Sequence, residues 1–125
     1  MASPEIVIYD DVQNRELGDT AFYIAKSLKL VSFFSTDAEE VSHQAGLYTR
    51  GVVTSDMAAF GRFRGLSPFT VSDLLEIPRL VFVDRQRNPS EYVRSDYPDL
   101  AVRRTDDHLE KRIEDWFKSL PIPRI

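Results

Sequence analysis

Short apolar runs alternate along the chain with segments in which apolar residues recur every three or four positions. Five runs have the length and composition typical of buried strands, and they are found at residues 6–9, 31–34, 51–55, 79–83 and 100–102. The intervening segments show helical spacing, as in Leu17, Ala21, Ile24 and Leu28. This alternation predicts a parallel sheet with helices on both faces, because right-handed crossovers join the strands.

The order of the expected elements defines the fold class. We predict an α/β protein of the (βα)5 type, a three-layer sandwich whose five-stranded parallel sheet has the flavodoxin-like order 2-1-3-4-5. The domain is expected to span residues 1–120. Because Pro121 and Pro123 cannot continue a helix, residues 121–125 are expected to form a tail or the start of a linker.

Polar residues before the helical segments predict where the helices begin. Thr36 opens a capping-box pattern and is the expected N-cap of the second helix. Ser67, which a proline follows, is expected to begin the third helix. Thr105 or Asp106 is the expected cap of the last helix, and residues 58–65 are expected to form a loop or a poorly formed helical turn.

Composition limits the classes of protein and of site. The 125 residues include no cysteine, which excludes disulfide bonds and thiolate metal sites, and we expect a cytoplasmic protein. No apolar run approaches the about 20 residues of a membrane span, so no membrane insertion is expected. The formal net charge of −4 disfavours direct nucleic-acid binding. Arg50, Arg62 and Arg64 form either a local basic patch or scattered solvated side chains.

Three of the expected strands end at acidic residues. Asp10 and Asp11 follow the first strand, Asp56 follows the third and Asp84 follows the fourth. In a parallel sheet the carboxyl ends of the strands share one edge, beyond which ligands bind. Converging carboxylates need a cation, a shared proton or wide spacing, so the pattern predicts a hard-metal or phosphoryl site.

The order and spacing of these acidic residues resemble a known family. Residues 6–11, a strand followed by an acidic pair, resemble the opening of receiver domains of two-component response regulators. The separation between Asp11 and Asp56 is close to the family's separation between its acidic pair and its phosphorylated aspartate. Residues 51–57 are similar to the family's third strand, and residues 100–105, with the amphipathic helix that follows, are similar to its fifth strand and last helix.

The resemblance implies a role for each acidic residue. Asp10 and Asp11 would bind Mg²⁺ together with Asp56, which would also be the phosphoacceptor. Carboxylate oxygens are the ligands that Mg²⁺ prefers, and a carboxylate nucleophile can hold a phosphoryl group as an acyl phosphate. The metal would offset the repulsion between Asp56 and the incoming phosphate. The implied partners are a histidine kinase, an output domain or a second copy of the chain.

Two departures from the family pattern change the expected function. Asp84 stands where the family has Thr or Ser, and its charge would repel a phosphoryl group. Arg103, or Arg104 if the register slips, stands in place of the family's Lys. We therefore expect an atypical receiver that acts mainly by protein–protein contact, with little stable phosphorylation at Asp56.

The contact surface is expected on the fourth helix, the fifth strand and the last helix. Tyr and Arg side chains are enriched at protein interfaces, and this region carries Tyr92, Arg94, Tyr97 and Arg104. An ordinary solvated face is the alternative.

Other interpretations of the same residues stay open. A TIR-like or nucleoside-deoxyribosyltransferase-like domain that binds or hydrolyses a nucleotide would need a glutamate in the cleft, for which Glu39 and Glu40 are the candidates. A plain scaffold domain with an acidic edge is a third reading. Asp10 or Asp11 could simply cap the first helix, and Asp84 is either a turn residue or a partner of Arg103.

Overall fold

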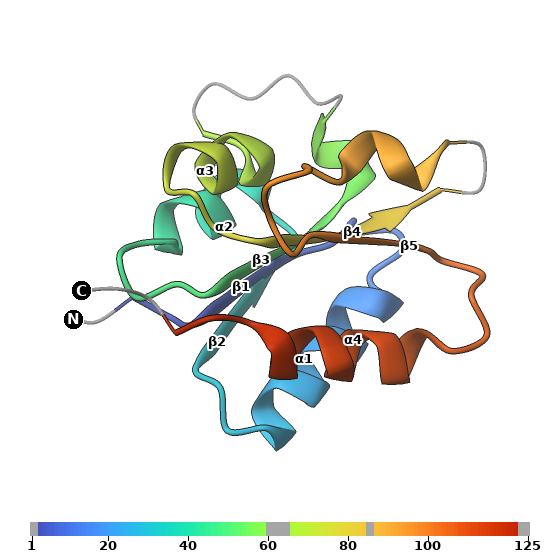
Figure 1. Ribbon diagram of the computed structural model, residues 1–125, viewed down its shortest axis with the longest axis horizontal. Helices are drawn as coiled ribbons and strands as arrows, with labels where there is room; N and C mark the ends of the chain where they lie inside the picture. Colours follow the sequence, from blue (N-terminus) through green and yellow to red (C-terminus); the bar gives the residue numbers. More distant parts are fainter. Residues whose placement is uncertain (1–2, 60–65, 85–86, 123–125) are drawn as a thin grey trace.

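The computed structural model of the chain describes residues 3–59, 66–84 and 87–122, and its elements alternate between strand and helix (Figure 1). The elements are β1 (Ile6–Tyr9), α1 (Glu16–Ser27), β2 (Ser32–Ser35), α2 (Ala38–Gln44), β3 (Gly51–Ser55), the 3-10 turn η1 (Asp56–Ala59), α3 (Pro68–Leu74), β4 (Arg79–Val83), the 3-10 turn η2 (Pro89–Tyr92), β5 (Leu100–Arg103) and α4 (Leu109–Ser119).

The five strands form one parallel sheet in the order β2-β1-β3-β4-β5, which confirms the predicted α/β fold class and is consistent with a flavodoxin-like fold. Helices α1 and α4 cover one face of the sheet, and α2 and α3 cover the other (Figure 1). The chain therefore has the three layers that the alternating pattern predicts.

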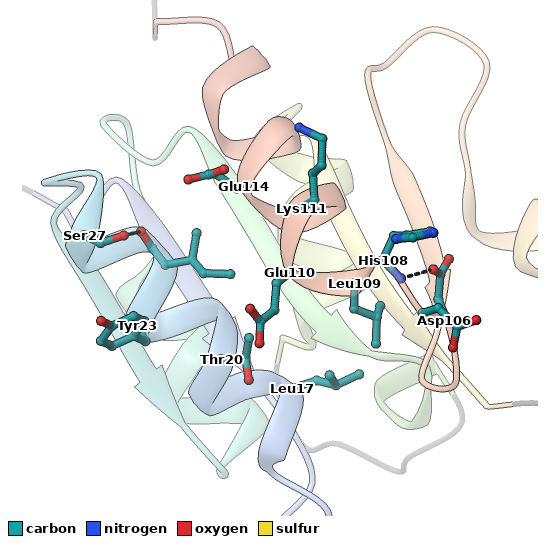
Figure 2. A pocket seen from close by; sticks show the side chains of 12 residues that line it. Leu17, Thr20, Tyr23, Ser27, Asp106, His108, Leu109, Glu110, Lys111 and Glu114 are labelled. Atoms are coloured by element: carbon teal, nitrogen blue, oxygen red, sulfur yellow. Dashed lines mark hydrogen bonds between the residues drawn. The ribbon is translucent and has the colours of Figure 1, made fainter.

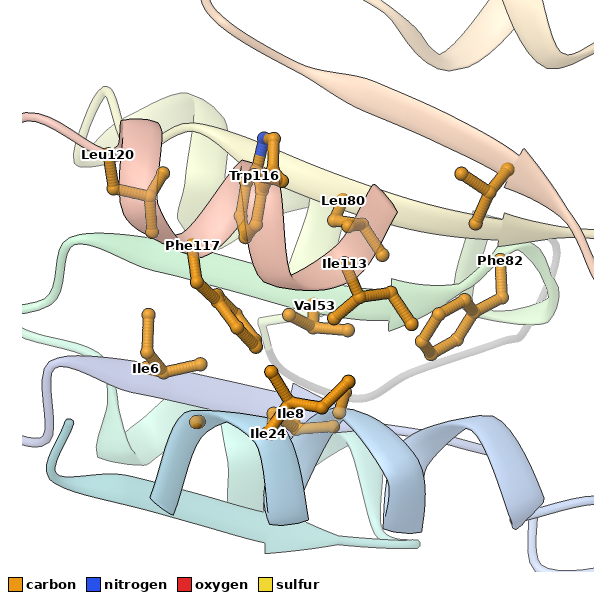
Figure 3. Packing of buried hydrophobic residues seen from close by; sticks show 13 residues of the cluster. Ile6, Ile8, Ile24, Val53, Leu80, Phe82, Ile113, Trp116, Phe117 and Leu120 are labelled. Carbon is orange, nitrogen blue, oxygen red and sulfur yellow. The ribbon is translucent and has the colours of Figure 1, made fainter. Parts of the chain in front are cut away.

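Both faces of the central strands are buried, which explains their uninterrupted apolar runs. Ile6 and Ile8 of β1 belong to the core beneath α1 and α4, where Phe82 and Phe117 are among the largest buried side chains (Figure 3). The alternate residues of β1 pack against α2 and α3 instead. The pleat of each strand thus decides which helix layer a side chain meets, and this also holds for the residues just beyond the strand ends.

The connections differ from the prediction in three places. The N-cap of α2 is Asp37 rather than Thr36, because the Asp37 carboxylate accepts the backbone N–H groups of Glu39 and Glu40. Helix α4 begins only at Leu109, since Asp106 accepts the His108 amide in a turn before it. The segment between β4 and β5 contains the 3-10 turn η2 where the (βα)5 pattern has a helix.

Two further expectations concern the ends and the loops. Ser67 caps α3, as predicted, by accepting the Thr70 amide. The predicted loop or turn at residues 58–65 lies largely outside the described residues, as do Arg62 and Arg64 of the basic patch. No described helix is long and apolar enough to cross a membrane.

Candidate functional site at the carboxyl edge of the sheet

Acidic residues follow directly after β1, β3 and β4 at the carboxyl edge of the sheet. Asp10 is 0% exposed and Asp56 is 1% exposed, whereas Asp84 is solvent-exposed. A buried carboxylate needs hydrogen-bond donors or a cation to replace the water it has lost. The partners of Asp10 and Asp56 therefore define what the site can do.

Asp10 is held by a partly buried arginine and two backbone amides. Its Oδ1 accepts hydrogen bonds from the Asp11 amide at 2.8 Å and from Arg104 Nη2 at 2.5 Å. Its Oδ2 accepts from the Gly18 amide at 2.8 Å and from Arg104 Nη1 at 3.4 Å. The Arg104 side chain is only 16% exposed. Both oxygens of Asp10 are thus occupied within the protein, and its charge is compensated by a bidentate guanidinium.

The approach of α1 to Asp10 depends on Gly18. A Cβ atom at Gly18 would lie 2.7 Å from the Asp10 Cβ and 2.8 Å from the Phe34 ring. Only a residue without a side chain allows the α1 backbone to come this close and donate its N–H to Asp10. Nothing in the sequence pattern singled out Gly18, because its role depends on a contact between two elements.

The pleat of β5 explains why Arg104, rather than Arg103, contacts Asp10. Val102 belongs to the core on the α1 and α4 side, while Arg103 is paired in register with Val83, whose side chain packs on the other face. Arg104 therefore returns to the side of Asp10, and its guanidinium lies 5.6 Å from the centre of the Phe82 ring. Of the two arginines considered from the sequence, Arg104 is therefore the one that binds Asp10.

Asp56 has a different set of partners. Its Oδ2 accepts the Asp84 amide at 3.1 Å and lies 3.6 Å from Nε of Arg87, whose side chain is 37% exposed. Because Arg87 is more exposed than Arg104, the ion pair between Asp56 and Arg87 keeps more contact with solvent than the pair between Asp10 and Arg104. The sequence analysis did not identify Arg87, since it lies in a polar connection without a periodic pattern.

Tyr92 lies next to Asp56 and Arg87 on the α3 side of the sheet. Burial raises the pKa of the Tyr92 hydroxyl and the Asp56 carboxylate adds to this shift, whereas Arg87 opposes it. The hydroxyl is buried and has no hydrogen-bond partner of good geometry among the described residues. The Tyr92 ring packs on Phe69 of α3, with 5.9 Å between the ring centres.

The carboxyl edge around β1 is negatively charged. Burial raises the pKa of Tyr9, and Asp11, Asp10 and Asp37 add to the shift, while Arg104 opposes it. Tyr9 therefore lies among carboxylates, and the Arg104 guanidinium compensates part of their charge.

Asp10 and Asp56 end neighbouring strands but turn toward opposite faces of the sheet. Asp10 bonds to α1 and to the residue after β5, whereas Asp56 bonds on the side where η2 and α3 lie. Within residues 3–59, 66–84 and 87–122, no group of three or more His, Cys, Asp or Glu side chains is arranged so that it could hold a metal ion. The Mg²⁺ set of Asp10, Asp11 and Asp56 stays a prediction.

The expected contact surface around η2 and β5 is largely committed to internal contacts. Tyr92 is 6% exposed and Arg104 is bound to Asp10. Arg94 is bidentate to Asp99, with Nε–Oδ2 at 2.8 Å and Nη2–Oδ1 at 3.0 Å, and its guanidinium stacks 3.9 Å from the centre of the Tyr97 ring. Tyr92 and Arg94 thus hold the β4–β5 connection in place rather than project from it, and Arg104, after β5, is held by Asp10.

The glutamates that a nucleotide-cleaving domain would use lie in the first turn of α2. The backbone amides of Glu39 and Glu40 are bound by the Asp37 cap, so this turn is built as an ordinary helix start.

No protein-family model matches the chain, and a search of curated proteins also finds no match.

Proposed function

We propose that this chain is a receiver-like signalling domain that acts by protein–protein contact and in which an internal arginine replaces the metal ion. The observation that carries the proposal is the bidentate Arg104 guanidinium on the fully buried Asp10. It supplies a permanent positive charge at the acidic pair. The strand order and the acidic strand ends support the receiver-like part of the proposal.

The donor set around Asp10 does not fit Mg²⁺. This ion binds carboxylate oxygens in an octahedral arrangement at short distance, whereas both Asp10 oxygens already accept hydrogen bonds. Binding the ion there would require Arg104 to leave its bidentate contact with Asp10, and the guanidinium and the ion would compete for the same carboxylate oxygens. The arginine therefore makes a metal-dependent switch unfavourable.

The surroundings of Asp56 also disfavour a stable acyl phosphate. The exposed Asp84 stands directly after β4, and its backbone amide already binds the Asp56 carboxylate. A phosphoryl group at Asp56 would add negative charge beside the Asp84 side chain, which like-charge repulsion opposes. Arg87, 3.6 Å away, offsets only part of this charge because it is partly solvated.

The proposal is tested by incubating the chain with acetyl phosphate and Mg²⁺ and measuring its intact mass. The Asp56→Asn variant and a typical receiver domain with its Thr and Lys intact are carried through the same procedure. We expect a gain of one phosphoryl group in the typical receiver and none in this chain. Mg²⁺ is expected to leave the thermal unfolding midpoint of this chain unchanged.

An Asp56-dependent gain of one phosphoryl group would overturn the proposal, since it would show a working phosphoacceptor. A Mg²⁺-dependent rise in the unfolding midpoint that Asp10→Asn abolishes would overturn the replacement of the metal by Arg104.

A further inference from the structure

A groove of about 690 Å³ runs between α1 and α4 (Figure 2). Leu17, Ile24 and Leu109 form its apolar part, and Tyr23 lies at its edge with 75% of its surface exposed. Thr20 and Ser27 donate their hydroxyl groups to carbonyl oxygens of α1 itself. The α1 wall is therefore mainly apolar, with one exposed aromatic ring.

The α4 wall of the groove is acidic. Asp107 and Glu110 are exposed, and neither forms an ion pair with another described residue. Glu114 forms an ion pair with Lys118, with 3.8 Å between Oε2 and Nζ. Figure 2 shows Glu110 between the two helices. Lys111 lines the groove as well, but it lies 3.6 Å from Asp115. The wall thus offers uncompensated negative charge beside an apolar surface.

We infer that this groove binds an amphipathic helix of a protein partner whose polar flanks are rich in Lys and Arg. Two helices that lie side by side present the kind of groove into which a third helix places its apolar face. Leu17, Leu109 and Tyr23 would meet that face, while Asp107 and Glu110 would attract the basic flanks. The inference rests on the proposed function, since it names the class of partner that the domain contacts.

The same charges disfavour a second copy of the chain as the occupant. A second copy would bring the same acidic α4 wall, and therefore charge of the same sign, to the contact. The chain as a whole also carries a net charge of −4, which opposes self-association. Charge complementarity therefore selects a basic partner.

The test uses the full chain and two labelled synthetic helical peptides of about 18 residues, or five turns. Both peptides have the same leucine face, and their polar flanks carry either Lys or Glu. Binding is measured by fluorescence anisotropy at several salt concentrations, and the bound surface is mapped by amide chemical shifts. We expect the Lys peptide to bind, to weaken with salt and to shift resonances of α1 and α4, and the Glu peptide not to bind.

Matched variants separate the groove from general attraction to an acidic protein. Glu110→Lys and Tyr23→Ala are expected to weaken binding about tenfold each. Glu40→Lys makes the same charge change on the exposed face of α2, and Tyr48→Ala removes another exposed tyrosine, so both should bind as the wild type does.

Equal weakening by Glu110→Lys and Glu40→Lys would overturn the inference, and so would absence of binding or a map centred away from α1 and α4. Shifts in α1 and α4 that depend on protein concentration without peptide would identify a second copy as the occupant instead. These outcomes are independent of the acetyl phosphate experiment, because a phosphorylated Asp56 would overturn the proposed function and leave the groove result intact.

Discussion

At the scale of single residues, the burial of the Asp10 carboxylate decides how the carboxyl edge is organised. A carboxylate without water is unfavourable unless its charge and its lone pairs are compensated. Arg104 and two backbone amides provide this compensation, and Gly18 lets one of those amides come close enough. The exposed pair between Arg15 and Asp19 shows the contrast, since both of its side chains are more than half exposed.

Replacing Arg104 with Gln should lower the free energy of unfolding by about 3–5 kcal/mol, because Asp10 would keep a buried charge without its cation. The measurement is urea unfolding followed by the fluorescence of the buried Trp116. Arg15→Gln is the control, and little measurable change is expected there because solvent screens an exposed pair. A loss in the Arg104 variant no larger than in the control would contradict the dependence of Asp10 on Arg104.

The sequence predicts which acidic residues follow the strands, but not which side chains they contact. Asp10 and Asp56 directly follow β1 and β3, at the strand ends that the sequence predicts, whereas the face of the sheet toward which each turns could not be read from the sequence. The choice between Arg103 and Arg104 could not be made from the sequence, since a shift of one residue moves a side chain to the other face of the sheet. Arg87 gave no signal, because its position depends on how the β4 connection folds onto Asp56.

Among the elements, the connection between β4 and β5 is held by an ion-pair network and short turns, where the alternating pattern predicted a helix. The Asp99 carboxylate, which is fully buried, accepts the backbone amides of Arg79 and Arg94 and the guanidinium of Arg94. Arg94 also donates to the Ile77 carbonyl at 2.7 Å. These contacts fasten the connection to the end of α3, and they explain why short turns suffice where the strand–helix alternation predicted a helix.

This network should make stability depend on acid pH. Burial alone would raise the pKa of Asp99, but the Arg94 guanidinium and the amides of Arg79 and Arg94 outweigh it, so the pKa lies below its ordinary value. The stability that the ionised Asp99 contributes is fully present above the ordinary carboxyl pKa of about 4 and is lost as the pH falls below it and through the lower pKa of the folded state. Asp99→Asn should therefore be less stable than the wild type at neutral pH, and the difference should shrink below about pH 4.

The measurement is urea unfolding of both proteins at a series of pH values. Asp73→Asn serves as the control, since the Asp73 side chain is 58% exposed and solvent screens its ion pairs with Arg79 and Arg94, so its replacement should change the free energy of unfolding less. A difference between the wild type and Asp99→Asn that stays constant from neutral to acid pH would contradict the assignment.

Element boundaries followed from the sequence where local patterns decide them. Strands β1, β3 and β4 have the predicted bounds, because a short segment rich in β-branched and other apolar residues marks each of them. Strand β2 is shifted by one residue, and Val31 is 65% exposed. The caps of α2 and α4 were missed, since several polar residues precede each helix and the sequence pattern does not decide where the helix begins among them.

At the scale of the whole molecule, the sheet is unevenly buried. Every residue of β1, β3 and β4 is buried, whereas all four residues of the edge strand β2 are only partly buried. Amides in strands with fewer buried contacts open at a lower free energy. The molecule therefore has a stable centre and a weaker edge on the side of β2.

Native-state hydrogen exchange should reveal this difference. We expect the amides of β3 to exchange only through global unfolding and those of β2 to exchange through a local opening of lower free energy. Strand β5, an edge strand with two buried residues, is the internal comparison and should lie between them. Equal protection of β2 and β3 would show that the molecule unfolds as one unit.

The bond between Arg104 and Asp10 also has a consequence for the order in which the chain folds. It joins residues 94 positions apart and crosses from the end of β1 to the end of β5, two strands that are not neighbours in the sheet. Such a contact closes a very long loop and gains its full strength only once β3 and β4 are in place between them. The bond between Arg104 and Asp10 is therefore expected to form after the folding transition state. Its removal, as in Arg104→Gln, should accelerate unfolding and leave the folding rate nearly unchanged.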